Sequence, residues 1–170
     1  FLEIITSINQ EDKKVADVVE KSKKKIALLS EIIFKKIDSG GRLFYIGSGT
    51  SGRLGILDAS ECPPTFGTNP SMVQGIIAGG SNAVFKSIEG AEDSSDDGAK
   101  IIMNKSINDN DIVIGISASG ITPYVLGALR KSYEIGAKTA LIQCNVSEKK
   151  KYINHHINVI VGPEIISGST

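Results

Sequence analysis

Arg42-Leu43-Phe44-Tyr45-Ile46-Gly47-Ser48-Gly49-Thr50-Ser51-Gly52-Arg53 is the stretch that decides the fold of this chain. Its apolar run, Leu43–Gly47, is rich in aromatic and aliphatic residues and predicts a buried strand. A cluster of glycines and hydroxyls then predicts a tight turn, and a helical pattern from Thr50 to about Ser60 follows at once. Such a turn exposes backbone N–H groups where the helix dipole is positive, so it suits an anion, most often a phosphate.

The glycine spacing of this turn also fits the dinucleotide fingerprint, Gly-x-Gly-x-x-Gly. That interpretation requires an acidic residue at the end of the second strand to hold a ribose. The second strand is expected at Gln74–Ala78, and it ends in Ala78-Gly79-Gly80 without a carboxylate. A P-loop is disfavoured because no Gly-Lys-Ser/Thr follows. A hydroxyl-rich loop of this kind suits a phosphomonoester on a small molecule, and a simple capped turn remains the alternative.

Length and composition restrict the class of protein. The chain has 170 residues, enough for one domain with a core, and its 19 basic and 19 acidic residues balance. We expect no nucleic-acid partner, because no basic stripe stands out, and no membrane span, because no apolar run is long enough. Cys62 and Cys144 lack metal-ligand spacing, and no secretory signal stands at the N-terminus. These features predict reduced thiols, a cytoplasmic protein and no metal.

Strands and helices alternate along the chain. A helical pattern from Glu11 to about Asp38 dominates an N-terminal segment, residues 1–40, and ends at Ser39-Gly40-Gly41. Pro63-Pro64 is expected to stop the helix that follows the first strand. Further strands are predicted at Gln74–Ala78, Asp111–Ile116, Lys138–Gln143 and Ile157–Val161. The pattern predicts an α/β fold, a three-layer, doubly wound parallel sheet of flavodoxin-like type over residues 41–170, preceded by the long N-terminal helix.

A second hydroxyl-rich turn, Ser117-Ala118-Ser119-Gly120-Ile121-Thr122-Pro123, repeats the first layout of strand, turn and helix. In parallel sheets ligands bind outside the carboxyl ends of the strands, so the two turns are expected to converge there. Acidic residues cluster between them. Asp96 and Asp97 suit the first turn of a helix that Ser94 or Ser95 caps. Glu89 and Glu92 have no such explanation, and a solvated acidic face remains the alternative for them.

Both loops together, Gly47-Ser48-Gly49-Thr50-Ser51 and Ser117-x-Ser119-Gly120-x-Thr122, resemble the sugar isomerase (SIS) domain, which binds phosphosugars. The chain is also similar, over nearly its whole length, to the N-acetylmuramic acid 6-phosphate etherase family. The matching segments are Tyr45–Gly55, Asp58-Ala59-Ser60-Glu61-Cys62-Pro63-Pro64-Thr65-Phe66, Ile77–Gly80, Glu89-Gly90-Ala91-Glu92-Asp93 and Val161-Gly162-Pro163-Glu164.

This resemblance implies a reaction. The family removes D-lactate from N-acetylmuramic acid 6-phosphate and leaves N-acetylglucosamine 6-phosphate, in recycling of cell-wall sugar in the cytoplasm. In the open-chain aldehyde a base removes the C2 proton, an acid protonates the departing lactate oxygen, and water adds to the alkene. By resemblance Glu61 is the proton donor and Glu92 its partner, with the reverse assignment open. Neither a metal nor a nucleotide cofactor is implied.

The same resemblance assigns the binding groups and the assembly. The hydroxyls expected to hold the phosphate or the sugar are those of Ser48, Thr50, Ser51, Ser117, Ser119 and Thr122, and Glu89 is expected to contact the sugar. Members are homodimers with sites near the interface. Because the chain ends in Ile166-Ser167-Gly168-Ser169-Thr170, a helix-capping sequence, we expect the natural protein to continue beyond it.

Two other functions remain possible at this point. A non-catalytic phosphosugar-binding regulatory protein of the SIS family, similar to the glucokinase regulatory protein, would need the loops but no proton donor at Glu61. A dinucleotide-binding domain would bind NAD in a saturable manner, which we do not expect.

Overall fold

The structure, a computed structural model, describes residues 1–166. Its centre is a five-stranded parallel sheet with the strand order β2-β1-β3-β4-β5. The strands are β1 (Leu43–Gly47), β2 (Val73–Ile77), β3 (Ile112–Ile116), β4 (Lys138–Gln143) and β5 (His155–Asn158). The parallel α/β sheet predicted from the alternating pattern is therefore confirmed.

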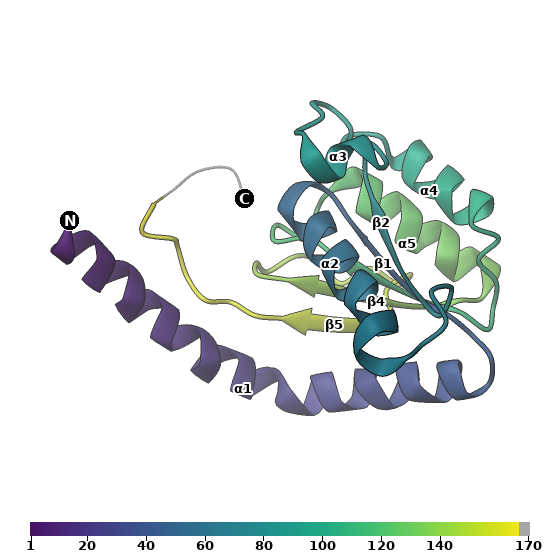
Figure 1. Cartoon of the computed structure of the whole chain (residues 1–170), viewed down its shortest axis with the longest axis horizontal. Helices are drawn as coiled ribbons and strands as arrows, with labels where there is room; N and C mark the ends of the chain where they lie inside the picture. The colour runs from purple at the N-terminus through teal and green to yellow at the C-terminus, as the bar shows by residue number, and fades with distance from the viewer. Residues whose placement is uncertain (167–170) are drawn as a thin grey trace.

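Helices precede and connect the strands (Figure 1). They are α1 (Leu2–Asp38), α2 (Gly49–Phe66), the short α3 (Asn82–Phe85), α4 (Ser95–Asn104) and α5 (Pro123–Ile135). Ser94 caps α4, because its side chain accepts a hydrogen bond from the N–H of Asp97, as expected for that stretch. In the part of the chain that the structure describes, no helix has the length and apolar character needed to cross a membrane.

Alternate residues of β1 enter two separate cores, which makes the fold three-layered. Phe44 and Ile46 are fully buried among side chains of α4 and α5, such as Ile102 and Leu129. Leu43 and Tyr45 lie on the other face, in a core with residues of α1 and α2. Since both faces are covered, the sheet is doubly wound and its strands read as nearly continuous apolar runs.

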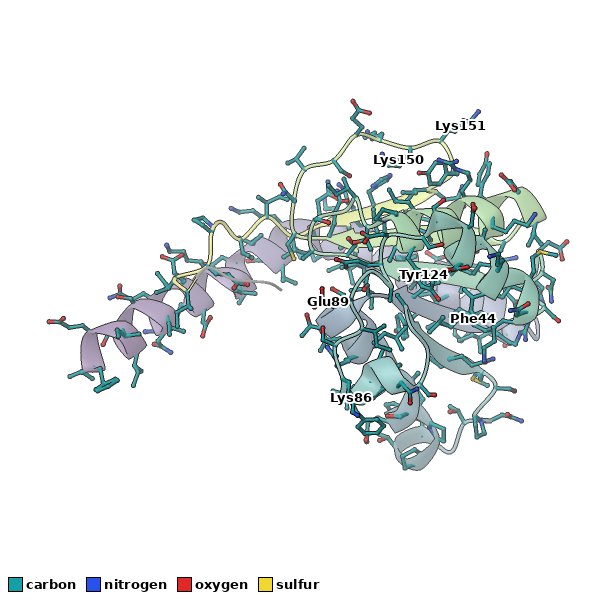
Figure 2. All side chains as sticks on the ribbon, turned by 90° about the horizontal axis from the view of Figure 1, so that it is seen from above. Phe44, Lys86, Glu89, Tyr124, Lys150 and Lys151 are labelled. Carbon is teal, nitrogen blue, oxygen red and sulfur yellow. The ribbon has the colours of Figure 1, made fainter. Side chains whose placement is uncertain are left out.

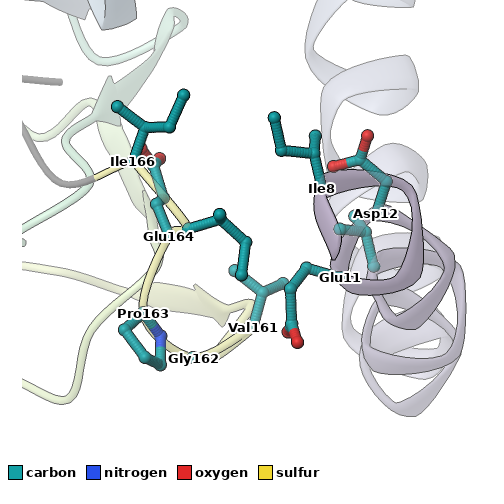
Figure 3. Close-up of a pocket in the computed structure, with 10 residues that line it drawn as sticks. Ile8, Glu11, Asp12, Val161, Gly162, Pro163, Glu164 and Ile166 are labelled. Atoms are coloured by element: carbon teal, nitrogen blue, oxygen red, sulfur yellow. The ribbon is translucent and has the colours of Figure 1, made fainter. Parts of the chain in front are cut away.

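Helix α1 is longer than its apolar pattern predicts. It begins at Leu2 rather than Glu11 and ends at Asp38, as expected. Its N-terminal half extends past the sheet (Figure 1), and its only buried residues are Ser22 and Leu29. The Ser22 hydroxyl donates to the Asn158 carbonyl at 3.0 Å, which holds the middle of α1 against β5. A cavity lies between Ile8–Val15 of α1 and the segment Val161–Ile166 (Figure 3).

The predicted boundaries need three corrections. The interpretation of Pro63-Pro64 as a helix stop is wrong, since α2 continues to Phe66. Both prolines lie in the last turn of α2, and the helix ends where Gly67, with φ of 65°, donates to the Pro63 carbonyl at 2.8 Å. Strand β2 lies one residue earlier than predicted, and β5 lies at His155–Asn158 rather than Ile157–Val161. The capping sequence expected at residues 167–170 lies outside the described residues.

Candidate functional site

The β1–α2 loop is built by close backbone approach. Ser48 is the N-cap residue of α2 in an extended conformation, and its side chain accepts no capping hydrogen bond. A Cβ atom at Gly52 would lie 2.6 Å from Ile77 Cγ1, and one at Gly47 would lie 2.6 Å from the Gly52 nitrogen. Only glycine fits at both places, so the start of α2 sits directly against β2 with its N–H groups at the sheet edge.

The β3–α5 loop is held in shape by its own hydroxyl groups. Ser117, only 3% exposed, lies 2.8 Å from Thr122 Oγ1 and 3.3 Å from Ser119 Oγ. Its oxygen also accepts a hydrogen bond from the Gly120 N–H at 3.1 Å. Because these contacts form within the loop, Ser119 and Thr122 are positioned before any ligand arrives, next to the N-terminus of α5.

Gln143, at the end of β4, supports this loop from below. It is 1% exposed, its amide nitrogen donates to Asn158 Oδ1 at 3.0 Å, and its oxygen accepts from Ser147 at 2.9 Å. Gly120 has φ of 73°, and a Cβ atom there would overlap the Gln143 side-chain oxygen. The loop therefore depends on a glycine that rests on a buried amide, which is hydrogen-bonded through both its nitrogen and its oxygen. Sequence reasoning missed Gln143, because it reads only as the last residue of a strand.

Two cavities meet at the carboxyl ends of the strands. The first, of about 360 Å³, lies at the β3–α5 loop, and the second, of about 280 Å³, lies between the start of α2 and residues 83–90. Ser48 and Glu92 line both cavities. Together the two cavities contain eight of the predicted site residues: Ser48, Thr50, Ser51, Glu89, Glu92, Ser117, Ser119 and Thr122.

Backbone contacts fix the position of Glu92 between the two cavities. Its carbonyl accepts a hydrogen bond from the Tyr124 N–H at 2.9 Å, which joins this segment to the first turn of α5. On the other side the Asp93 N–H donates to the Gly90 carbonyl at 3.2 Å. The carboxylate of Glu92 is exposed at this junction, where it is accessible to a ligand that occupies both cavities.

Glu61 is not part of this cluster within one subunit. It lies on α2, exposed, and lines neither cavity. It is the twelfth residue after Gly49, where α2 begins, and this corresponds to about 18 Å along the helix axis. Asp58, one turn earlier, faces Tyr45 of β1. Burial, followed by the hydrogen bond and charge of Asp58, raises the pKa of Tyr45 above its ordinary value.

Sequence reasoning also missed two cationic residues of the second cavity, Arg53 and Lys86. Arg53 stands inside the stretch that decides the fold, but its spacing carries no signal for its role. Lys86 is a single lysine in an irregular segment. Both enter the cavity only because α2 and residues 84–86 are brought together, with Arg53 Nε donating to the Val84 carbonyl at 2.9 Å.

Comparison with solved structures shows the same fold. A phosphoheptose isomerase from Neisseria gonorrhoeae superposes with a TM-score of 0.66 at 12% identity, over 96% of this chain and 86% of that one. A phosphoheptose isomerase from Francisella tularensis gives 0.65 at 17% identity, over 91% and 85%. At these identities the likeness concerns the fold alone.

Sequence comparison is more specific. The family model described as the glucokinase regulatory protein N-terminal SIS domain matches residues 24–133. An N-acetylmuramic acid 6-phosphate etherase from Clostridium beijerinckii is 52% identical over 99% of this chain and 56% of its own length. The etherase of the same name from Bacillus cereus is 50% identical over 99% of this chain and 58% of its own. The chain spans little more than half the length of these relatives. It belongs to the SIS-domain family, and its sequence is similar to N-acetylmuramic acid 6-phosphate etherases over nearly its whole length.

Proposed function

We propose that this protein is a carbon–oxygen lyase that cleaves the lactyl ether of N-acetylmuramic acid 6-phosphate, giving N-acetylglucosamine 6-phosphate and D-lactate. The observation that supports it most is the 52% identity to a relative named for this activity, over 99% of the chain. Residues 1–40 form an N-terminal helical segment and residues 41–170 the phosphosugar-binding domain. The protein acts in the cytoplasm, in recycling of cell-wall sugar.

The phosphate of the substrate binds in the cavity at the β3–α5 loop. Ser119 and Thr122 are held there by the buried Ser117, and Ser48 and Ser51 line the same cavity from the β1–α2 loop. The N-termini of α2 and α5 both lie at this edge, and each favours negative charge. The phosphate is on C6, away from the reacting carbons C2 and C3. Its binding in this cavity fixes those two carbons over the junction of the two cavities.

Glu92 acts on the substrate at that junction. It removes the proton from C2 of the open-chain aldehyde, where the C1 carbonyl stabilises the resulting carbanion. The C2–C3 double bond then forms as the C3–O ether bond breaks, and the departing lactate oxygen takes a proton from Glu61. Water adds back across the double bond, placing a hydroxyl on C3 and a proton on C2. The opposite assignment, in which Glu61 is the base and Glu92 is the acid, is also compatible with this mechanism.

Glu61 reaches this site from a second subunit of a homodimer. On α2 it shares one helix face with Leu54 and Leu57, which are 60% and 58% exposed. An apolar face of this kind, next to a carboxylate that lines neither of the two cavities described above, favours burial against a second copy of the chain.

The direct test is proton NMR with N-acetylmuramic acid 6-phosphate in deuterated water. The lactate methyl signal should appear while the C2 proton is replaced by deuterium. In Glu61→Gln we expect C2 exchange without lactate release, and in Glu92→Gln neither signal. A wild-type protein that binds the sugar phosphate but shows neither exchange nor release would contradict the proposal and favour a regulatory, non-catalytic member of the SIS family.

A mixing experiment tests the shared site. Each of the two glutamine variants is inactive alone, but a mixed dimer contains one site with both glutamates intact. Random exchange of subunits makes half of the dimers mixed, so about a quarter of the wild-type activity should return. No recovery, with subunit exchange verified by native mass spectrometry, would mean that Glu61 and Glu92 act within one subunit.

A further inference from the structure

The second cavity contains two positive charges that have no carboxylate partner. Lys86 and Arg53 line it, and within residues 1–166 the ion pairs of the protein involve other side chains. Two carboxylates, Glu89 and Glu92, line the same cavity, but within residues 1–166 neither forms an ion pair with Lys86 or Arg53. Both cations therefore keep unpaired charge that an anionic group of a ligand could meet.

The backbone around Lys86 is fixed on two sides. Its N–H donates to the Asn82 carbonyl at 3.1 Å, where the short helix α3 ends. Its carbonyl lies 3.4 Å from Arg53 Nη2, and Arg53 Nε holds the neighbouring Val84 carbonyl. The side chain of Lys86 is exposed and makes no hydrogen bond within the described residues, so its ammonium group is free to meet a ligand. Figure 2 shows Lys86 near Glu89, at the opposite end of the domain from Lys150 and Lys151.

The proposed substrate has a second anion in a suitable place. Its phosphate is on C6, and its lactyl group, which ends in a carboxylate, is on C3. With the phosphate at the β3–α5 loop and C2 at Glu92, the C3 substituent extends past Glu92 into the second cavity, because Ser48 and Glu92 form the wall that both cavities share.

We propose that Lys86, with Arg53 behind it, binds the lactyl carboxylate and selects substrates that carry it. This inference rests on the proposed function of the same site. It assigns a role to each cavity, with the phosphate in one and the lactyl carboxylate in the other. It also explains how product leaves: the sugar product has lost the carboxylate and with it the contact to Lys86, so lactate and sugar phosphate separate.

The test compares two inert ligands that differ in one charge. The first is N-acetylmuramic acid 6-phosphate reduced at C1 to the alcohol, which is open-chain but has no carbonyl to acidify the C2 proton. The second is the same compound with the lactyl carboxylate converted into a carboxamide. Both are titrated into the full 170-residue chain by isothermal calorimetry at low ionic strength.

The wild-type chain should bind the carboxylate about tenfold more tightly than the carboxamide, as a hydrogen-bonded charge pair predicts. Lys86→Met should reduce that preference about fivefold, because an exposed ion pair contributes at most about that much, and leave carboxamide binding unchanged. Lys24 is an exposed lysine of α1, far from the cavity in sequence. Lys24→Met makes the same change in net charge and should keep the wild-type preference.

The outcomes separate this inference from the proposed function. Equal affinity of the wild-type chain for both ligands, or an unchanged preference in Lys86→Met, would overturn the carboxylate subsite while phosphosugar binding stands. Failure of the wild-type chain to bind either ligand would overturn the proposed function, and the subsite with it.

Discussion

Replacing Gly120 by alanine tests how the β3–α5 loop is supported. The backbone there has φ of 73°, and the new Cβ atom would overlap the side-chain oxygen of Gln143. Moving the Gln143 side chain would break hydrogen bonds, because its buried amide is bonded to Asn158 and Ser147. We therefore expect Gly120→Ala to strain the backbone at residue 120 and also to displace the Gln143 side chain.

The magnitude follows from the two effects. A left-handed backbone conformation costs an alanine about 1–2 kcal/mol. Displacing Gln143 breaks two hydrogen bonds, each contributing about 0.5–1.5 kcal/mol. The expected loss in the free energy of unfolding is therefore about 2–5 kcal/mol, with the amide accounting for about 1–3 kcal/mol of it.

Urea denaturation of Gly120→Ala and of a matched variant, Gly40→Ala, measures these effects. Gly40 has φ of 83°, and a Cβ atom added to it would have no other atom within 4 Å, so its substitution carries the backbone cost alone. Gly120→Ala should be the less stable of the two by about 1–3 kcal/mol. Equal losses would show that Gln143 moves freely, and they would refute its role as the support of the β3–α5 loop.

Two other predictions concern stability. Asp111, 1% exposed, accepts hydrogen bonds from the backbone and guanidinium of Arg42 and from the Asn108 N–H. Asp111→Asn should lower the free energy of unfolding by about 2–3 kcal/mol. This loss is smaller than that for breaking a fully buried ion pair, because Arg42 is partly exposed. Burial, and then the charge of nearby lysines, lowers the pKa of His155 and His156 below 6.5. The unfolded chain then binds more protons than the folded chain below that pH, so Tm should fall as the pH is lowered from about 7 to about 5.

Each of these has a control. Asp109→Asn removes an exposed carboxylate from the same loop and should leave urea stability nearly unchanged; an equal loss in both variants would contradict the role of the Asp111 pair. The double variant His155→Gln and His156→Gln should flatten the dependence of Tm on pH in calorimetry. A slope as steep as that of the wild-type chain would assign the acid sensitivity to other groups.

The sequence contains most of what is needed to place the loops. Aromatic and aliphatic residues between polar ends mark β1 and β3, and each is followed by a hydroxyl-rich turn and a helix. In a parallel sheet this order puts both turns at one edge, and the structure brings Ser48, Ser51, Ser119 and Thr122 to one cavity there. Local pattern and topology together thus locate the candidate phosphate site.

The remaining features arise from contacts between segments distant in the sequence. Gln143 has its role because Gly120 of another loop rests on it, and Lys86 enters the second cavity because Arg53 binds the backbone of residues 84–86. Pro63-Pro64 reads as a helix stop, yet packing of α2 on the sheet and the left-handed Gly67 carry the helix to Phe66. Neither periodicity nor spacing in one sequence reports such contacts.

The strand order also determines how the chain must assemble during synthesis. Leu43 of β1 pairs with Val73 and with Ile112, which are 30 and 69 residues further along the chain (73 − 43 and 112 − 43). At a ribosomal rate of about 5–20 residues per second, β1 waits roughly 3–14 s for its β3 neighbour. During that time the backbone N–H and C=O groups on one edge of β1 are unpaired, so the nascent chain depends on its β1–α2–β2 unit to protect β1 from association with other chains.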